Sequence, residues 1–139
     1  MTWQDEKAKT QAAMRDIVAQ VPQGVVVSVD MAATGILFEC NQTGPNGEKL
    51  HSWTGPTSIA VKPGTDIESI VKSMESHYRE SRFRVDADQN LRGNYRIQVS
   101  PPEEGSKYLI SQDGPGQIRI AGWSECFQLP DGLYPGGDF

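Results

Sequence analysis

The residues best suited to molecular recognition are arginines that gather in the second half of the chain. Five of them crowd into one short stretch of a protein with a formal net charge of −5: Arg79, Arg82, Arg84, Arg92 and Arg96. Guanidinium groups offer planar, bidentate donors to anions, and a neighbouring tryptophan adds a large contact area. By strand alternation, the predicted outward-facing binding residues are Arg82, Arg84, Arg96, Arg119 and Trp123.

This outward face has two interpretations. The first is a surface that binds an anionic polymer or a protein partner. The second is an ordinary solvated sheet face, with Asp86 and Glu39 balancing part of its charge and the C-terminal tail covering part of it.

The histidines and acidic residues give weaker grounds for catalysis. His51 and His77 have no accompanying HExxH, GxSxG or phosphate-binding glycine motif, so structural or surface roles are favoured for both. The spacing of Asp30, Glu39 and Asp86 neither requires nor forbids that these carboxylates converge in the folded chain. A small hydrolase-like enzyme that uses them is therefore kept as an alternative.

Metal-binding patterns are incomplete. The segment 86–90, Asp-Ala-Asp-Gln-Asn, begins like a calcium loop, but Leu91 stands where the sharp turn needs glycine and Ile97 where a bidentate glutamate should be. The two cysteines, Cys40 and Cys126, form no CxxC motif and have no His/Cys zinc spacing. The sequence therefore predicts no metal and no cofactor.

The two cysteines are instead predicted to form a disulfide. Cys40 has the strand parity of Ile36 and Phe38, and Cys126 has that of Ile120 if the last strand contains no bulge. Both thiols are therefore expected to point toward the buried face. The alternative is a pair of buried free cysteines. A disulfide is typical of exported proteins, so this pairing favours an extracytoplasmic location.

Two helices and seven strands are expected to position these residues. Thr2 can cap a helix over 3–21, and a capping box formed by Thr65 and Glu68 opens a second helix that runs to Ser81. Apolar alternation and β-branched runs predict strands over 25–29, 35–41, 49–62, 82–87, 95–99, 107–112 and 117–124.

This order predicts one α+β domain over residues 1–139, with two helices packed on one face of a mainly antiparallel sheet. A helix followed by a meander occurs twice, which allows a weak internal duplication. The segment 127–139 has no periodicity and is expected to be an irregular tail packed on the domain.

Length and charge narrow the class of protein. A chain of 139 residues fits one domain, and its net charge lacks the basic excess of a nucleic-acid-binding protein. No apolar run reaches the roughly 20 residues of a membrane-spanning helix. Because Met1 opens directly into a polar helix, the sequence indicates either a cytosolic protein or one whose targeting segment lies upstream of the residues given.

Five short features spread over most of the chain carry a family resemblance. A capped N-terminal helix and an internal cysteine precede Thr54-Gly-Pro-Thr57, then Lys62-Pro-Gly-Thr-Asp66, and finally Glu125-Cys-Phe-Gln-Leu-Pro-Asp-Gly132. Together they resemble the mature part of small cell-envelope lipoproteins of actinobacteria. The resemblance implies a lipid anchor upstream of Met1 and no assigned activity, although no lipobox cysteine is present in these residues.

The leading functional prediction is a non-enzymatic binding module of the bacterial cell envelope, with an anionic envelope polymer or a protein as its partner. A small envelope enzyme would instead show acids converging in a deep pocket. A cytosolic regulatory subunit would show reduced cysteines and a symmetric dimer surface. The sequence leaves the ligand and the oligomeric state open.

Overall fold

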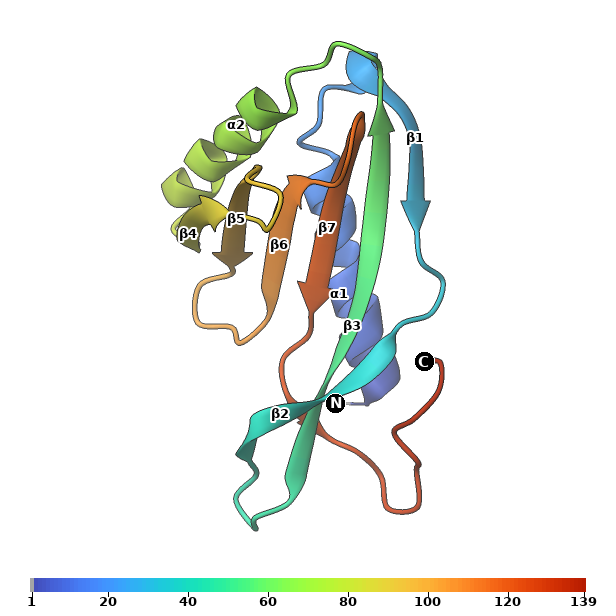
Figure 1. Cartoon of the computed structure of the whole chain (residues 1–139). Helices are drawn as coiled ribbons and strands as arrows, with labels where there is room; N and C mark the ends of the chain where they lie inside the picture. Colours follow the sequence, from blue (N-terminus) through green and yellow to red (C-terminus); the bar gives the residue numbers. More distant parts are fainter. Residues whose placement is uncertain (1) are drawn as a thin grey trace.

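The computed structural model describes residues 2–139 and confirms the α+β class, with two helices packed against an eight-stranded, mainly antiparallel open sheet (Figure 1). The helices are α1 (Trp3–Val18) and α2 (Ile67–Glu80), and a 3₁₀ turn covers Gln23–Val25. The strands are β1 (Val26–Met31), β2 (Ile36–Thr43), β3 (Lys49–Val61), β4 (Arg84–Gln89), β5 (Tyr95–Ser100), β6 (Lys107–Gln112), β7 (Gln117–Trp123) and β8 (Phe127–Gln128).

The long strand β3 organises the sheet. It pairs with β1 and β2 along one edge and with β7 and β8 along the other, so each of these pairs of strands lies end to end beside it. Beyond β7 the order continues through β6 and β5 to β4, and every pair is antiparallel. Figure 1 shows β3 running the full length of the molecule, with β2 pairing only its lower end.

The first helix begins as predicted. The Thr2 hydroxyl accepts a hydrogen bond from the Asp5 amide, and the Asp5 carboxylate accepts one from the Thr2 amide, which completes a capping box. The helix ends at Val18, because beyond the cap residue Ala19 the amides of Gln20 and Val21 bond carbonyls only three residues back. The predicted extension to Val21 is therefore wrong.

The second helix has a different cap from the predicted one. The Asp66 carboxylate accepts hydrogen bonds from the amide and the hydroxyl of Ser69. The Thr65 hydroxyl donates to the Lys62 carbonyl in the preceding turn, so it does not cap the helix. Asp66 is as good a cap as threonine and also suits the positive helix N-terminus, which explains why it takes this role.

The core lies between the helices and one face of the sheet. Antiparallel pairing places Thr57, Ile120, Ile110 and Ile97 in a single row across β3, β7, β6 and β5. The residues with no more than 1% exposure that meet there include Met14 from α1, Val71 and Met74 from α2, and Trp53 from β3. Burial of these apolar side chains is the main driving force for the fold.

Helix α1 packs tightly against the sheet at Gly122 in β7. A methyl group at this position would lie 3.0 Å from Thr10 Cγ2, 3.1 Å from Met14 Sδ and 3.2 Å from Tyr108 Cδ1. All three neighbours are buried. We therefore predict that Gly122→Ala lowers the free energy of unfolding by about 1 to 2 kcal/mol, measured by urea denaturation, because these side chains have no room to move.

Gly24→Ala is the matched control for this prediction, because a methyl group there would meet nothing within 4 Å. We expect this variant to match the wild type to within about 0.5 kcal/mol. Equal stability of the two variants would show that α1 does not press on β7.

One prediction from strand parity is wrong. Ile36 and Phe38 do not point into the core but are 52% and 57% exposed, whereas Leu37 between them packs against the core. Register explains this, because Leu37 pairs with Trp53, which faces the helices, and Phe38 pairs with Ser52 on the other side. Alternation alone did not identify the buried face, because this strand carries apolar residues on both faces.

The predicted Cys40–Cys126 disulfide is confirmed, but its expected position in the core is wrong. The bridge joins β2, on one edge of β3, to the segment between β7 and β8, which pair with the other edge. Both cysteines are only partly buried, do not belong to the core cluster, and line a hollow on the side of Phe38. The bridge therefore holds together the end of the sheet that the helices leave unsupported.

The C-terminal segment contains more order than its sequence suggests. Phe127–Gln128 forms β8, and Phe139 is 8% exposed, with its ring 5.1 Å from that of Trp3. Phe139 exchanges two backbone hydrogen bonds with Gly35, and its carbonyl also accepts one from the Trp53 indole at 3.1 Å. These contacts fix the tail beside the junction of β1 and β2.

Candidate functional site

The face of the sheet that carries no helix, called the open face below, is the candidate functional site. Antiparallel pairing arranges its outward side chains in rows across the strands. The first row contains Asp88, Arg96, Ser111, Arg119, Ser58 and Asp30. The second contains Asp86, Gln98, Leu109, Ala121 and Pro56. The third contains Lys107, Trp123, Thr54 and Ile36.

Most residues in the middle of these rows have small side chains, so the larger side chains around them project further from the sheet. Ser58, Ser111, Ala121 and Pro56 separate the long side chains of the neighbouring positions. As a result, three hollows are found on the open face, and Trp123 lines all of them. Trp123 is therefore the centre of the candidate site.

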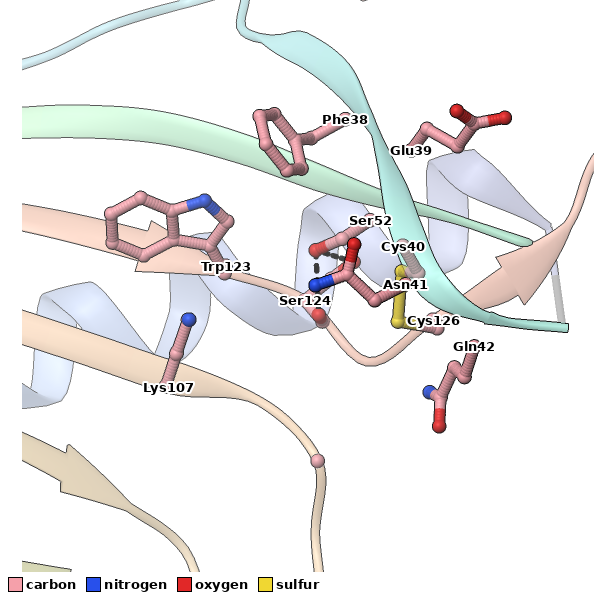
Figure 2. A pocket seen from close by; sticks show the side chains of 11 residues that line it. Phe38, Glu39, Cys40, Asn41, Gln42, Ser52, Lys107, Trp123, Ser124 and Cys126 are labelled. Carbon is pink, nitrogen blue, oxygen red and sulfur yellow. Dashed lines mark hydrogen bonds between the residues drawn. A yellow bond between two sulfur atoms is a disulfide. The ribbon is translucent and has the colours of Figure 1, made fainter. Parts of the chain in front are cut away.

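The first of the three hollows, called the disulfide hollow, has a volume of about 420 Å³. Figure 2 shows Trp123 and Phe38 on either side of it, with the Cys40–Cys126 bridge at one end. The Lys107 ammonium lies 5.3 Å from the centre of the Trp123 ring, a cation–π arrangement that helps to orient the indole. The Ser52 hydroxyl donates a 2.7 Å hydrogen bond to the Ser124 carbonyl at the base.

The second, the arginine hollow, has a volume of about 350 Å³ and holds most of the positive charge of the open face. Arg92, Arg96 and Arg119 line it, with Asp113 as the single acidic residue. Its apolar walls are formed by Leu91, Leu109 and Trp123.

The third hollow of the open face, called the tail hollow, has a volume of about 480 Å³. It is lined by residues that include Ile36, Pro56, Arg119, Trp123 and Asp138.

The arginines that line the second hollow differ in how they are held. Arg96 makes a bidentate pair with Asp88, at 2.9 and 2.7 Å, and hydrogen bonding to Arg96 lowers the pKa of the Asp88 carboxyl. Within residues 2–139, Arg92 and Arg119 form no ion pair. These two guanidinium groups are therefore available to an anionic group of a ligand.

The structure brings together three of the five predicted binding residues, Arg96, Arg119 and Trp123. Arg84 shares the open face by register but lies at its margin, where it donates to the Glu104 carbonyl at 2.7 Å. The predicted place of Arg82 on a strand face is wrong. This residue has a φ of 65° in the turn after α2, and β4 begins only at Arg84.

Sequence reasoning missed the apolar part of the site. The hollows are lined by Phe38 and Ile36, together with the cationic Lys107. Leu91 lines the arginine hollow and is fully exposed in the β4–β5 turn. The signal that could have revealed the first two was the run Ile-Leu-Phe, which places apolar groups on both faces of one strand. One of those faces had to be outside the core.

The candidate catalytic residues do not form a common site. Asp30 and Asp86 lie on β1 and β4, at opposite ends of the strand order, and Glu39 pairs with Lys49 at 3.3 Å. His51 lies opposite Phe127, and its Nδ1 is buried without a hydrogen-bond partner. His77 is exposed on α2 and packs edge-on against Tyr78.

Comparisons of this chain with protein-family models, with curated proteins and with solved structures give no match. The observations that bear on function are therefore those of the molecule itself. The disulfide is consistent with an extracytoplasmic location. No helix within residues 2–139 has the length and apolar character needed to cross a membrane. In the same range, no group of three or more His, Cys, Asp or Glu residues is arranged to hold a metal ion.

Proposed function

We propose that this protein is a non-enzymatic binding module of the bacterial cell envelope, and that its open face binds a protein partner around Trp123. The observation that carries the proposal is the position of Phe38 and Ile36, both more than half exposed, beside a tryptophan that lines three adjoining hollows. Exposed aromatic and aliphatic groups clustered on one face are typical of interaction surfaces.

A protein partner fits these residues better than an anionic polymer does. A polymer of phosphates or uronates would use the arginine hollow but would leave Phe38 and Ile36 exposed to water. A folded protein would cover the apolar side chains and could also place a carboxylate between Arg92 and Arg119. Aromatic residues and arginine are the types enriched at such interfaces.

The envelope location rests on two supports. The disulfide forms and persists in oxidising compartments, which favours a position outside the cytoplasm. The sequence motifs resemble those of actinobacterial envelope lipoproteins, for which a lipid anchor upstream of Met1 is implied. The anchor, like the location, belongs to the proposal.

Site-specific crosslinking tests the binding face directly. A photoreactive benzoylphenylalanine replaces Phe38 in one variant and Val27 in another, since both side chains are exposed but Val27 lies on the outer strand β1. We expect a discrete protein adduct from position 38 only, identified by mass spectrometry and then purified. Similar adducts from both positions would contradict the proposal.

With the purified partner, we predict that Trp123→Ala weakens binding at least about thirtyfold, because central interface tryptophans contribute about 2 kcal/mol or more. Val27→Ala is the control and is expected to change Kd less than twofold. Binding of soluble polyphosphate that is lost in Arg119→Ala but retained in Phe38→Ala, without a protein adduct, would favour the anionic polymer in place of a protein.

A further inference from the structure

A separate hollow lies on the opposite side of the sheet, between α1 and α2. Its volume is about 360 Å³, which falls within the range of small-ligand sites. Asp16 and Ile17 of α1 form part of one wall, and His77 and Tyr78 of α2 form part of another. It shares no lining residue with the three hollows of the open face.

Aromatic rings form much of this interhelical hollow. It is lined by Tyr78 and Tyr108, which are 6% and 2% exposed, and by the partly buried Phe83. The ring centres of Tyr78 and Phe83 are 4.8 Å apart, so the two rings present one continuous apolar surface. Aromatic faces carry partial negative charge and therefore attract cations as well as apolar groups.

The ionisable groups of the hollow are mainly acidic. Asp16 and Glu104 both line it, and Glu104 already pairs with Lys9 at 2.5 Å. Burial, followed by the charge of Asp16, raises the pKa of Tyr78 to about 12, so its hydroxyl stays neutral and can donate or accept a hydrogen bond. Apart from His77, no lining side chain can carry positive charge, in contrast to the arginine hollow of the open face.

We propose that the interhelical hollow binds an organic cation of side-chain size, an ammonium or guanidinium group on a short aliphatic stem. The aromatic surface would contact the stem and the cation face-on, and Asp16 would pair with the charge. Such a cation has two sources, a free amine or a basic side chain of a polypeptide. This inference does not depend on the proposed function of the open face.

The test uses n-butylguanidinium as the probe and n-butylurea as its neutral analogue, at pH 8. Amide chemical shifts of the ¹⁵N-labelled full chain are followed during titration. We expect saturable changes that centre on residues 13–20 and 77–83 with butylguanidinium, and none with butylurea. Changes elsewhere, or equal binding of the neutral analogue, would overturn the proposal.

Two variants and a control make the assignment specific. We expect Asp16→Asn to weaken butylguanidinium binding about threefold to fivefold, as for an exposed ion pair, and Asp16→Asn/Phe83→Leu about tenfold. Asp113→Asn, which removes a carboxylate on the open face, is expected to leave the Kd unchanged. An unchanged Kd in a folded Asp16→Asn/Phe83→Leu variant would overturn the proposal.

A capped peptide with one central arginine distinguishes the two sources. If it binds more tightly than butylguanidinium to the wild type and loses affinity in Asp16→Asn, the hollow accepts a polypeptide side chain. If it is excluded while butylguanidinium binds, the hollow accepts a free amine or guanidine. Failure of both probes to perturb residues 13–20 would contradict the site itself.

Discussion

Replacement of both cysteines, Cys40→Ala with Cys126→Ala, is expected to lower the free energy of unfolding by about 3 kcal/mol or more. The bridge joins positions 86 residues apart, and the chain-entropy model gives about 4 to 5 kcal/mol for a loop of that length as an upper figure. Little packing is lost, since both side chains lie outside the core. Urea denaturation followed by circular dichroism measures the change, with an expected fall in Tm of about 10 °C.

A reducing agent provides the matched comparison. The wild type treated with dithiothreitol should unfold at the urea concentration of the double variant, and the variant should not respond to the reagent. A double variant within about 1 kcal/mol of the oxidised wild type would show that the bridge does not restrict the unfolded chain to a useful extent. The lower end of β3 would then be stable through pairing with β2 and β8 alone.

Trp53→Ala is expected to be the most destabilising single substitution, with a loss of about 3 to 5 kcal/mol. Trp53 is completely buried, and its indole also donates to the Phe139 carbonyl. The substitution therefore leaves a cavity and releases one of the contacts that hold the C-terminal residues. Urea denaturation measures the loss, and limited proteolysis should show faster cleavage within residues 129–139 than in the wild type.

Trp123→Ala is the matched control, because it removes the same side chain from the open face. We expect its free energy of unfolding to fall by no more than about 1 kcal/mol, while its partner binding weakens at least about thirtyfold. Equal destabilisation by the two substitutions would contradict the division of the sheet into a core face and an open face. It would also show that Trp123 contributes to the stability of the fold and is not reserved for binding.

The arginine hollow and the interhelical hollow have opposite electrostatic character. The arginine hollow gathers Arg92, Arg96 and Arg119, whereas the interhelical hollow presents Asp16 and Glu104. Because the sheet and its core separate them, ligands of opposite charge can be tested on one protein without competition. Variants of one site serve as controls for the other.

Much of the fold follows from the sequence, because its determinants are local. Strand β6 has the bounds that alternation predicts, 107–112. Thr2 caps α1 because its hydroxyl accepts a hydrogen bond from the amide of Asp5, only three residues further along the chain. The partner of Cys40 was also predictable, since Cys126 is the single other cysteine in the chain. Propensity, capping and turn chemistry depend on neighbours within a few positions, so one sequence is enough to read them.

The tertiary structure alone decided which face of β2 was buried and which side chains met. Alternation assigned Ile36 and Phe38 to a common face but could not tell that the helices cover the other one. The approach of Arg96, Arg119 and Trp123 depends on the register of β5, β6 and β7. Strand register and helix docking are set by the packing energy between residues that are distant in the chain. A pattern of residues along the chain does not reveal that energy.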